Sequence, residues 1–563
     1  MKIDVDIAKK ASLKPITQIA AKAGIPKKYL ESYGEYKAKV SLEFLHKIST
    51  QRRAGYIVVT GITPTHLGEG KTVTTIGLAM ALNSGGKTAI ACIREPSIGP
   101  FFGVKGGGVG GGRSQVSPAE DINLHLTGDI HAVGAAHNLC ASFLDNHLYR
   151  GNKLKIDTAR IYWKRVVDIN DRSLRYVRIG LGGGANGVER DTGFDITAAS
   201  ELMAILALAG NIADLRKRIS DITVALSKDK KRVSCDDLQV GGAMALLLKD
   251  ALEPNLVQTI ENTPCFVHTG PFANITHGNS SIVCDRMALG LADYVVTESG
   301  FGADCGLEKF MDIKSRVSGL RADAAVLVAS IRALKVHSGR YRMAVGKDLD
   351  RHMSREDVDA VEQGCANLEK QIQNVRVYGI PCIVALNRFA GDTPREIAAV
   401  RSRALDAGAF DCVETQMYQR GSKGGAELAE AVRQACRAKS QFRFLYELDT
   451  PIKKKIETIA IKIYGARGVR YEKQAEENIA LFEKLGMKKL PICMAKTHLS
   501  LSHDPKLKGA PRDFVLPIRD VKPSTGAGFL YALCGGTQTM PSLSSHPLGE
   551  HIDIDTKGRM VVK

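Results

Sequence analysis

The chain reads Tyr56-Ile-Val-Val-Thr-Gly-Ile-Thr-Pro-Thr-His-Leu-Gly-Glu-Gly-Lys-Thr-Val-Thr-Thr75, an apolar run that leads through a glycine-bearing turn into a helix-like segment. The turn ends in Gly70-Lys71-Thr72, as a phosphate-binding loop does. Backbone N–H groups of such a loop, together with the positive end of the next helix, cradle phosphate oxygens. Lys71 would supply a charge to the terminal phosphates, and the Thr72 hydroxyl a ligand for Mg²⁺. Thr65 stands where the consensus has glycine.

The flanking sequence supports the phosphate-binding interpretation. A β-branched run, Ile57 to Val59, precedes the turn, and apolar residues at helical spacing follow it up to Asn83–Gly86, where glycine would end a helix. The alternative is a glycine turn in an α/β crossover with an incidental lysine. We favour phosphate binding because strand, turn and helix occur in the order that the motif requires.

Length and composition indicate a large cytoplasmic protein. At about 150 residues per domain, 563 residues predict roughly three or four domains. No apolar run approaches the roughly 18 residues of a membrane span, and Met1–Lys10 is charged where a signal peptide is apolar. The 12 cysteines are scattered without metal-binding spacing, which is typical of reduced thiols in a cytosolic enzyme. We therefore expect a soluble, cytoplasmic protein without a membrane partner.

The chain is strongly basic, since 78 Lys and Arg against 60 Asp and Glu give a formal net charge of +18. Such a charge favours anionic partners, whether nucleic acid, nucleotides or carboxylate-rich small molecules. The basic runs Lys228–Arg232 and Lys453–Lys455 are short, lack interleaved aromatic residues and match no nucleic-acid-binding motif. We interpret them as solvated surface and expect no nucleic-acid partner.

Strand-like apolar runs alternate with helical patterns over most of the chain, which predicts an α/β fold with a largely parallel sheet. The candidate strands are Ile57–Thr60, Ala89–Ile93, Val177–Leu181, Cys265–His268, Tyr294–Thr297, Ala325–Ala329 and Cys382–Leu386. A helix is predicted over Asp195–Leu208, with Asp195 as its cap. Because ligands bind beyond the carboxyl ends of strands in open α/β sheets, we expect the site in the loops that follow these strands.

Arg94 follows the second candidate strand and should emerge at the same sheet edge as Lys71. An arginine there can clamp a phosphate or carboxylate with two parallel hydrogen bonds. The alternative is a surface salt bridge with Glu95 or another acid. We favour the clamp because the predicted strand order places Arg94 beside the phosphate loop.

Two further segments leave alternatives open. Gly103–Gly112 contains seven glycines and is either a mobile cover over phosphates, with Lys105 reaching in, or a flexible linker. In Glu120–His131, the spacing of Asp121, His125 and Asp129 would put three polar side chains on one helical face, although Gly128 interrupts the helix. A metal site is one interpretation of these side chains. We favour the other, in which they buttress a polar cleft.

Many motifs, taken together and in order, resemble formate–tetrahydrofolate ligase, also called 10-formyltetrahydrofolate synthetase. They are Thr63-Pro-Thr-His-Leu-Gly-Glu-Gly-Lys-Thr72, Arg94-Glu-Pro-Ser97, Glu120-Asp-Ile-Asn-Leu-His125, Thr127-Gly-Asp-Ile-His-Ala132, Asp168-Ile-Asn-Asp-Arg172, Gly270-Pro-Phe-Ala-Asn274, Ala292-Asp-Tyr-Val-Val-Thr-Glu298, Gly300-Phe-Gly-Ala-Asp304 and Met494-Ala-Lys-Thr497. The resemblance covers nearly the whole chain, from about Ile16 to Ile554.

The resemblance implies that the chain joins formate to tetrahydrofolate with ATP, giving 10-formyltetrahydrofolate, ADP and phosphate through formyl phosphate. Lys71 and Thr72 would then hold ATP and its Mg²⁺, and Arg94 would bind formate and then formyl phosphate. Glu95 and Asp129 would belong to a monovalent-cation site, for K⁺ or NH₄⁺, or to the catalytic surroundings. The implied ATP-binding residues are Thr63, Pro64, Thr65, His66, Leu67, Gly68, Glu69, Gly70, Lys71, Thr72 and, packing on the adenine, Phe301.

The resemblance also implies a folate site and an assembly. The pterin ring would lie between Phe389 and Tyr418, the second of which is commonly tryptophan in the family; tyrosine keeps a flat stacking face. The basic surface suits the anionic polyglutamate tail of tetrahydrofolate, and a homotetramer is the expected assembly. Because only about fifty residues precede the phosphate-loop strand, we expect the monofunctional form.

The predicted fold is therefore α/β, a P-loop NTPase-like, mostly parallel sheet with helices on both faces and additional smaller α/β domains. Its predicted parts are an N-terminal helical arm (1–50), a P-loop nucleotide-binding α/β core with inserted segments (51–360), an α/β folate-binding region (361–450) and a C-terminal domain (451–563). The alternative function is a P-loop nucleotide-dependent binding switch without folate chemistry.

Overall fold

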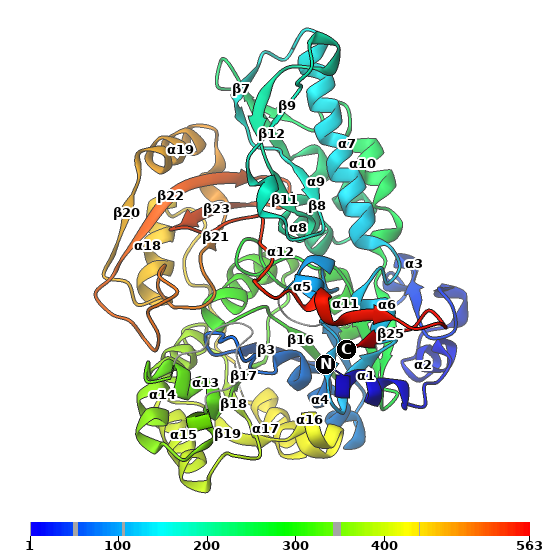
Figure 1. Ribbon diagram of the computed structural model, residues 1–563, viewed down its shortest axis with the longest axis vertical. Helices are drawn as coiled ribbons and strands as arrows, with labels where there is room; N and C mark the ends of the chain where they lie inside the picture. The colour runs from blue at the N-terminus through cyan, green and yellow to red at the C-terminus, as the bar shows by residue number, and fades with distance from the viewer. Residues whose placement is uncertain (1, 49–53, 104–106, 342–350, 439) are drawn as a thin grey trace.

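A large twisted sheet forms the centre of the computed structural model, which describes residues 2–48, 54–103, 107–341, 351–438 and 440–563 (Figure 1). Its strands follow the order β1 (Leu30–Ser32), β2 (Ala38–Val40), β14 (Asn255–Thr259), β15 (Pro264–Val267), β4 (Ala89–Ile93), β16 (Tyr294–Glu298), β3 (Gly55–Gly61), β17 (Ala324–Ala329), β18 (Cys382–Asn387) and β19 (Asp411–Thr415). From β15 to β19 all neighbours are parallel, whereas β1, β2 and β14 pair antiparallel at one edge. The mostly parallel α/β fold is confirmed.

Helices cover both faces of this sheet, because successive side chains of each central strand enter different hydrophobic clusters. On β3, Val58 belongs to one cluster and Ile57 and Val59 to the other. The first cluster includes residues of α11 (Ile282–Leu291) and α14 (Val358–Arg376), and the second includes residues of α4 (Lys71–Ser84) and α17 (Ala426–Arg437). The central strands are buried on both sides, as their continuous apolar sequences predict.

The predicted strand, turn and helix of the phosphate-binding loop are present. β3 ends at Gly61, and α4 begins at Lys71 and ends at Ser84, with Gly85 as its C-cap. Met80 and Leu82 are buried against the sheet, as the apolar spacing predicts.

Two smaller units pack around the main sheet (Figure 1). One is inserted between β6 (Ser114–Ser117) and β14 and has a hydrophobic core of its own. It contains α7 (Asp129–Tyr149), β7 (Ile156–Ile161), β8 (Arg165–Val167), β11 (Phe194–Ile196), α8 (Glu201–Leu208), α9 (Ile212–Ser220), β12 (Thr223–Ser227), β13 (Arg232–Ser234) and α10 (Gly241–Leu247). The other is a sheet in the order β20 (Gly468–Tyr471), β22 (Val515–Ser524), β23 (Phe529–Cys534) and β21 (Ile492–Ala495), with α18 (Ile452–Lys462) and α19 (Lys473–Lys484). These units agree with the predicted smaller α/β parts.

The two ends of the chain lie close together (Figure 1). The N-terminal segment holds α1 (Lys2–Lys9), α2 (Ile16–Lys22) and α3 (Leu42–Leu45), as well as the edge strands β1 and β2. The C-terminal hairpin is β24 (Ile552–Ile554) and β25 (Met560–Val562), and Lys9 Nζ donates to the carbonyl of Met560 at 3.1 Å. The division at residues 50, 360 and 450 stays a prediction. β18 and β19, from the predicted third part, continue the same sheet as β3.

Two local predictions are wrong. Val177–Leu181 does not join the parallel sheet: β9 (Val177–Ile179) forms an antiparallel hairpin with β10 (Arg190–Thr192). Its sequence alternates through exposed Arg178, whereas a central parallel strand is apolar throughout. The helix predicted from Asp195 begins at Glu201, because the Ser200 side chain accepts from the backbone N–H of Met203 and caps α8.

Among the helices in the described ranges, none combines the length and the apolar character that crossing a bilayer requires.

Candidate functional site

A cavity of ≈ 360 Å³ opens at the carboxyl ends of β3, β4 and β16, where the sequence predicts the site. We call it the P-loop cavity. Residues from several separate segments line it: Thr72, Arg94, Glu95, Pro96, Ser97, Pro100, Phe101, Gly107, Gly108, Asn170, Gly270, Phe272, Asn274, Ile275, Glu298, Phe301, His498, Gln538 and Pro541. The structure therefore brings Thr72, Arg94, Glu95 and Phe301, all predicted site residues, to one cavity.

The backbone of the phosphate-binding loop depends on glycine at two positions. Gly68 has φ +72° and Gly70 has φ +84°, both in the left-handed region. A Cβ on Gly70 would lie 2.6 Å from Asn387 Nδ2, at the end of β18. Only glycine therefore fits at Gly70, directly before the first residue of α4.

Glu69 ties the loop together from within. Its Oε1 accepts from the backbone N–H of Thr65 at 2.6 Å and from the Thr65 hydroxyl at 3.0 Å, and its Oε2 lies 3.9 Å from Lys71 Nζ. The Thr65 hydroxyl in turn accepts from the N–H of Leu67 at 3.2 Å. Thr65, the departure from the glycine consensus, thus has a hydrogen-bonding role in holding the loop.

The front of the loop is fixed to α14 and α13 (Ile331–His337). The Thr63 N–H donates to Asn367 Oδ1 at 3.0 Å, and Asn367 and Gln371 both donate to its hydroxyl. His337 Nε2 lies 2.8 Å from the Thr63 carbonyl. Pro64 is also buried, whereas His66 is exposed at the turn. This anchoring preorganises one end of the loop and leaves the tip toward solvent.

Arg94 enters the cavity from the end of β4. Its Nη1 donates to the carbonyl of Pro271 at 3.1 Å, and its Nη2 lies 3.5 Å from Glu298 Oε1. Its Nε is buried and has no hydrogen-bond partner within the described ranges. A buried guanidinium donor without a partner is costly, so this arginine is suited to an anion that enters the cavity.

Glu298, the last residue of β16, is the residue of this site that sequence reasoning missed. It is 5 % exposed, and its Oε2 accepts from the Thr72 hydroxyl at 2.7 Å. A signal was present, since a single acid ends the apolar run Tyr294-Val-Val-Thr-Glu298 and that run is part of one of the family-like motifs, but the motif by itself assigns Glu298 no role. A hydroxyl and a carboxylate are the hard oxygen donors that Mg²⁺ prefers, so the donor set fits that ion.

Phe301 forms part of the cavity wall together with His498. The two rings stack with centroids 4.0 Å apart and an interplanar angle of 18°. Phe301 has φ +60°, an uncommon backbone conformation for a residue with a bulky side chain. Such strained conformations concentrate at binding sites, where the surrounding structure holds them.

Glu95 and Asp129 occupy different environments. Glu95 lines the cavity, and burial, with the nearby Asp129 charge, raises its pKa well above the usual range; its Oε2 has no partner in the described parts of the chain. Asp129 instead holds Lys39, with its Oδ1 2.8 Å and its Oδ2 3.0 Å from the ammonium, and accepts from Asn255 at 2.8 Å. Asp129 is therefore already neutralised by a buried lysine.

The polar side chains of Glu120–His131 do not form one cluster. Gly128, with φ +91°, is the N-cap of α7, so α6 (Ala119–Asn123) and α7 are separate helices. Asp121 and His125 are exposed, and Asp121 pairs with Lys37 at 2.8 Å. The predicted common helical face is wrong because the glycine ends the helical geometry between the acids.

The glycine-rich run is packed rather than loose in its described part, Gly107–Gly112; Lys105 lies outside the described residues. A Cβ on Gly107 would lie 1.9 Å from Asn123 Oδ1, and one on Gly112 would lie 2.2 Å from the Tyr418 carbonyl. Gly107 and Gly108 line the cavity. This part is therefore a close-fitting wall of the cavity rather than a loose linker, whereas the cover with Lys105 reaching in stays a prediction.

Phe389 and Tyr418 follow the paired ends of β18 and β19 and do not line the P-loop cavity. Arg332 lies over the Phe389 ring, 4.2 Å from its centroid. The Tyr418 hydroxyl donates to Asp4 Oδ1 at 2.8 Å, and Asp4 also accepts from the N–H of Gly112 at 2.8 Å. The tyrosine hydroxyl thus bonds to the N-terminal helix, a contact that tryptophan could not make in the same way.

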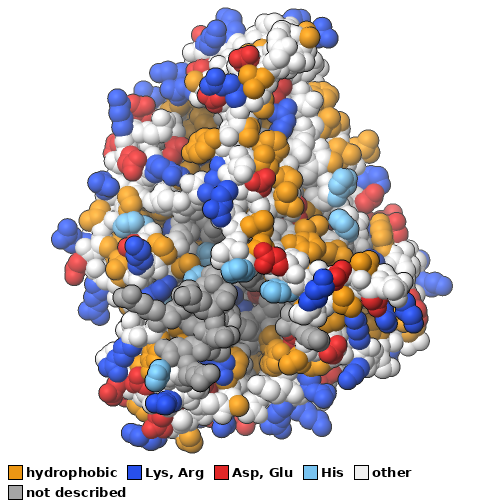
Figure 2. All heavy atoms as spheres, in the orientation of Figure 1, with side chains coloured by type: hydrophobic (Ala, Val, Ile, Leu, Met, Phe, Trp, Pro, Cys, Tyr) orange, Lys and Arg blue, Asp and Glu red, His pale blue; other side chains and the backbone are white. Residues whose placement is uncertain are grey.

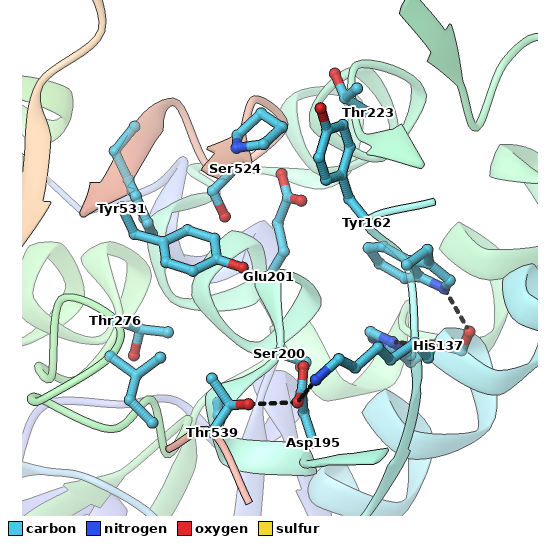
Figure 3. Close-up of a pocket in the computed structure, with 16 residues that line it drawn as sticks. His137, Tyr162, Asp195, Ser200, Glu201, Thr223, Thr276, Ser524, Tyr531 and Thr539 are labelled. Carbon is cyan, nitrogen blue, oxygen red and sulfur yellow. Dashed lines mark hydrogen bonds and ion pairs between the residues drawn. The ribbon is translucent and has the colours of Figure 1, made fainter. Parts of the chain in front are cut away.

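A second cavity, of ≈ 40 Å³, lies between the inserted unit and the C-terminal sheet; we call it the insert cavity (Figure 3). Ile275 lines both cavities. Asp195 accepts from Lys164 at 3.1 Å and from the Thr539 hydroxyl at 2.5 Å. Burial raises the pKa of Glu201 to about 8, although the backbone N–H groups of Gly526 and Ala527 donate to its Oε1.

Comparison with known proteins agrees with this geometry. The family model described as formate–tetrahydrofolate ligase matches residues 2–562. The chain belongs to the formate–tetrahydrofolate ligase family. Curated relatives of that name are 54% identical over 559 residues in Roseiflexus castenholzii, covering 99% of both chains, and 52% identical over 558 residues in Desulforamulus reducens, covering 99% of this chain and 98% of that one. A relative from Cutibacterium acnes is 51% identical over 561 residues and covers both chains fully.

Membership of the formate–tetrahydrofolate ligase family confirms the resemblance inferred from the motifs and makes the chain an enzyme of the ligase class. It gives no support to the alternative of a nucleotide-dependent binding switch without folate chemistry.

Proposed function

We propose that this enzyme joins formate to tetrahydrofolate with ATP, giving 10-formyltetrahydrofolate, ADP and phosphate, and that the reaction takes place in the P-loop cavity. The observation that carries the proposal is the meeting of Thr72 and Arg94 in one cavity directly beyond Lys71. A nucleotide held by the loop from Thr63 to Thr72 would present its terminal phosphate toward Arg94.

The first step joins two anions, so its main requirement is charge neutralisation. Formate is ionised at neutral pH and needs no general base to attack the γ-phosphate; it needs in-line positioning. Arg94 has a buried donor to offer a carboxylate, and Lys71 would exchange a 3.9 Å contact with Glu69 for a phosphate. We propose that Arg94 binds formate and then formyl phosphate, while Lys71 holds the phosphate under attack.

Mg²⁺, when bound with ATP, would be held through Thr72 and would supply further neutralisation of the phosphate charge. Phe301 is proposed to pack on the adenine, which its half-buried position in the cavity wall beside His498 supports. The backbone N–H groups of the loop and of the first turn of α4 provide the remaining phosphate contacts.

For tetrahydrofolate we propose that the pterin ring packs against Phe389 and Tyr418. Both side chains follow adjacent strand ends on the P-loop side of the sheet, and Asn387, two residues before Phe389, donates to the Glu69 carbonyl at 3.4 Å. The net charge of +18 suits the anionic polyglutamate tail. Figure 2 shows basic side chains spread over the visible face with acidic ones among them, rather than gathered in one patch.

We further propose the finer properties that the family resemblance implies: a K⁺ or NH₄⁺ site, a homotetramer and a cytoplasmic location. Glu95 supports the cation site better than Asp129 does, because Lys39 already neutralises Asp129. Exposed apolar side chains on α7 and α10, namely Phe143, Tyr149, Leu246 and Leu247, support contact with a second copy. Free thiols at all 12 cysteines fit a reducing compartment.

The test is product formation by the purified enzyme. With ATP, Mg²⁺, formate and tetrahydrofolate together, we expect 10-formyltetrahydrofolate and stoichiometric ADP, and omission of any one substrate should stop both. Failure to form 10-formyltetrahydrofolate in the complete mixture would disprove the proposal. In the same assay, Tyr418→Ala should raise the KM for tetrahydrofolate while leaving that for formate unchanged.

A further inference from the structure

Glu298 stands between the two strands that carry the phosphate-binding loop and the arginine clamp. β16 pairs in parallel with β3 on one side, where Glu298 is opposite Val59, and with β4 on the other, where Thr297 is opposite Cys92. The chain leaves β3 toward the loop and leaves β4 toward Arg94. The carboxyl end of β16 therefore points between both subsites, as the rule for open α/β sheets requires of a ligand-binding position.

The two oxygens of Glu298 divide between these subsites. Oε2 accepts from the Thr72 hydroxyl at 2.7 Å, and Oε1 lies 3.5 Å from Arg94 Nη2. The carboxylate is 5 % exposed, and what exposure it has is toward the P-loop cavity that it lines. An acid would hinder phosphate binding here by repulsion unless a cation came with the phosphate.

We propose that Glu298 is the protein carboxylate that binds the Mg²⁺ of the nucleotide together with Thr72, and that it links this ion to Arg94. The inference rests on the proposed ATP site. Hydroxyl and carboxylate oxygens are the ligands by which phosphate-loop enzymes hold Mg²⁺ beside bound phosphates. The same carboxylate would then face two positive groups, the Mg²⁺ of the nucleotide subsite and the Arg94 guanidinium of the formate subsite.

The inference predicts a linkage between metal and nucleotide. In the parent enzyme Mg²⁺ should strengthen ADP binding markedly, because it cancels the repulsion between Glu298 and the phosphates. In Glu298→Gln that repulsion is gone and so is the anionic ligand. ADP should therefore bind at least as tightly without metal, while the gain from Mg²⁺ falls at least about tenfold, the usual effect of losing a metal-supporting group.

Calorimetric titration of ADP into the full-length protein measures this linkage, once with Mg²⁺ and once with EDTA. Electron paramagnetic resonance of Mn²⁺ with the ADP complex gives a second readout, in which Glu298→Gln should bind Mn²⁺ at least about tenfold more weakly. Glu298→Asp, which keeps the charge, should recover part of the affinity. Glu369→Gln is the matched control: it removes one carboxylate from an exposed ion pair with Arg403 and should change neither readout.

The outcomes separate this inference from the proposed function. If the parent protein binds no ADP under either condition, the proposed ATP site is wrong. If the parent binds ADP but Glu298→Gln has an unchanged Mg²⁺ gain and unchanged Mn²⁺ affinity, Glu298 is not the metal ligand. Equal weakening of ADP with and without metal would mean that Glu298 only supports the fold of the loop, which also overturns the inference.

Discussion

The two cavities that Ile275 helps to line hold buried glutamates in opposite electrostatic situations. In the P-loop cavity, Glu298 meets a guanidinium and a hydroxyl. In the insert cavity, the Oε1 of Glu201 accepts from two backbone N–H groups, and burial raises the pKa of this carboxyl to about 8. The first carboxylate lies beside a cation, whereas burial favours the neutral form of the second near pH 7. Burial alone therefore does not distinguish the two acids, whereas the cation beside Glu298 and the unpartnered Arg94 Nε do.

The largest effect should follow from removing the lysine at the edge of the P-loop cavity. Lys71→Ala removes the charge proposed to hold the phosphate that formate attacks, and kcat should fall by at least about 10²- to 10³-fold. The substitution lies at the first residue of α4, where alanine is a good helix former, so the melting temperature should stay close to that of the parent. Initial-rate kinetics with circular dichroism melts would check both. Substantial remaining activity in a folded variant would rule out the phosphate role.

Two charge-conserving substitutions can be compared, one of the arginine in the P-loop cavity and one of the lysine in the insert cavity. Arg94→Lys keeps the charge but loses the planar fork, so kcat/KM for formate should fall by about 10²-fold, with a rise in formate KM. Lys164→Arg keeps the ion pair with Asp195 and should leave formate kinetics within about twofold of the parent. Steady-state kinetics at varied formate compares them. Equal effects of the two exchanges would show that Arg94 has no special role in formate binding.

The neutral state of Glu201 should be visible in how the thermal stability of the protein depends on pH. The folded-state pKa of Glu201, about 8, lies above its ordinary value of 4.5, so the folded protein holds a proton that the unfolded chain has lost. The stability that comes from the neutral carboxyl is lost as pH rises through about 8. Glu201→Gln keeps an acceptor for Gly526 and Ala527 but cannot ionise. Its melting temperature should therefore exceed that of the parent by an amount that grows from pH 6 to pH 9.

Thermal melts at several pH values, read by calorimetry, test this dependence, and activity at pH 7 should change little because Glu201 lies outside the P-loop cavity. Melting curves of parent and variant that stay parallel from pH 6 to pH 9 would contradict the neutral state of Glu201.

Site residues could be predicted from the sequence most reliably where a motif directly follows the end of a predicted strand. Lys71 and Thr72 could be placed from the glycine turn, and Arg94 from its strand, because parallel strands end at the same edge. Glu298 could not, since one acid after an apolar run is common and only the strand order puts β16 between β3 and β4. The same limit explains Val177–Leu181, an apolar run whose alternation with Arg178 belongs to an exposed hairpin.

Side-chain partners contributed by distant segments were equally out of reach. Lys39 neutralises Asp129 from 90 residues away, and Asp4 bonds to Tyr418 across 414 residues. Neither pair has a local pattern, so the pairing of Asp129 with Lys39 could not be weighed when cation binding was considered for Asp129 from its spacing and from family resemblance. The tyrosine at position 418, where the family commonly has tryptophan, can likewise be explained only from the structure, in which its hydroxyl donates to Asp4 of the N-terminal helix.

The smallest effect should come from Ile275, which lines both cavities. Ile275→Val deletes one methylene at a position that is 4% exposed, which should cost about 0.5–1.5 kcal/mol of unfolding free energy. Because neither Arg94 nor Glu298 depends on that methylene for a hydrogen bond or ion pair, formate kinetics should remain within about twofold of the parent. Denaturant unfolding and steady-state kinetics measure the two quantities. A tenfold loss of kcat/KM at unchanged stability would show instead that Ile275 positions the substrates, and the two cavities would then have to be treated as one site.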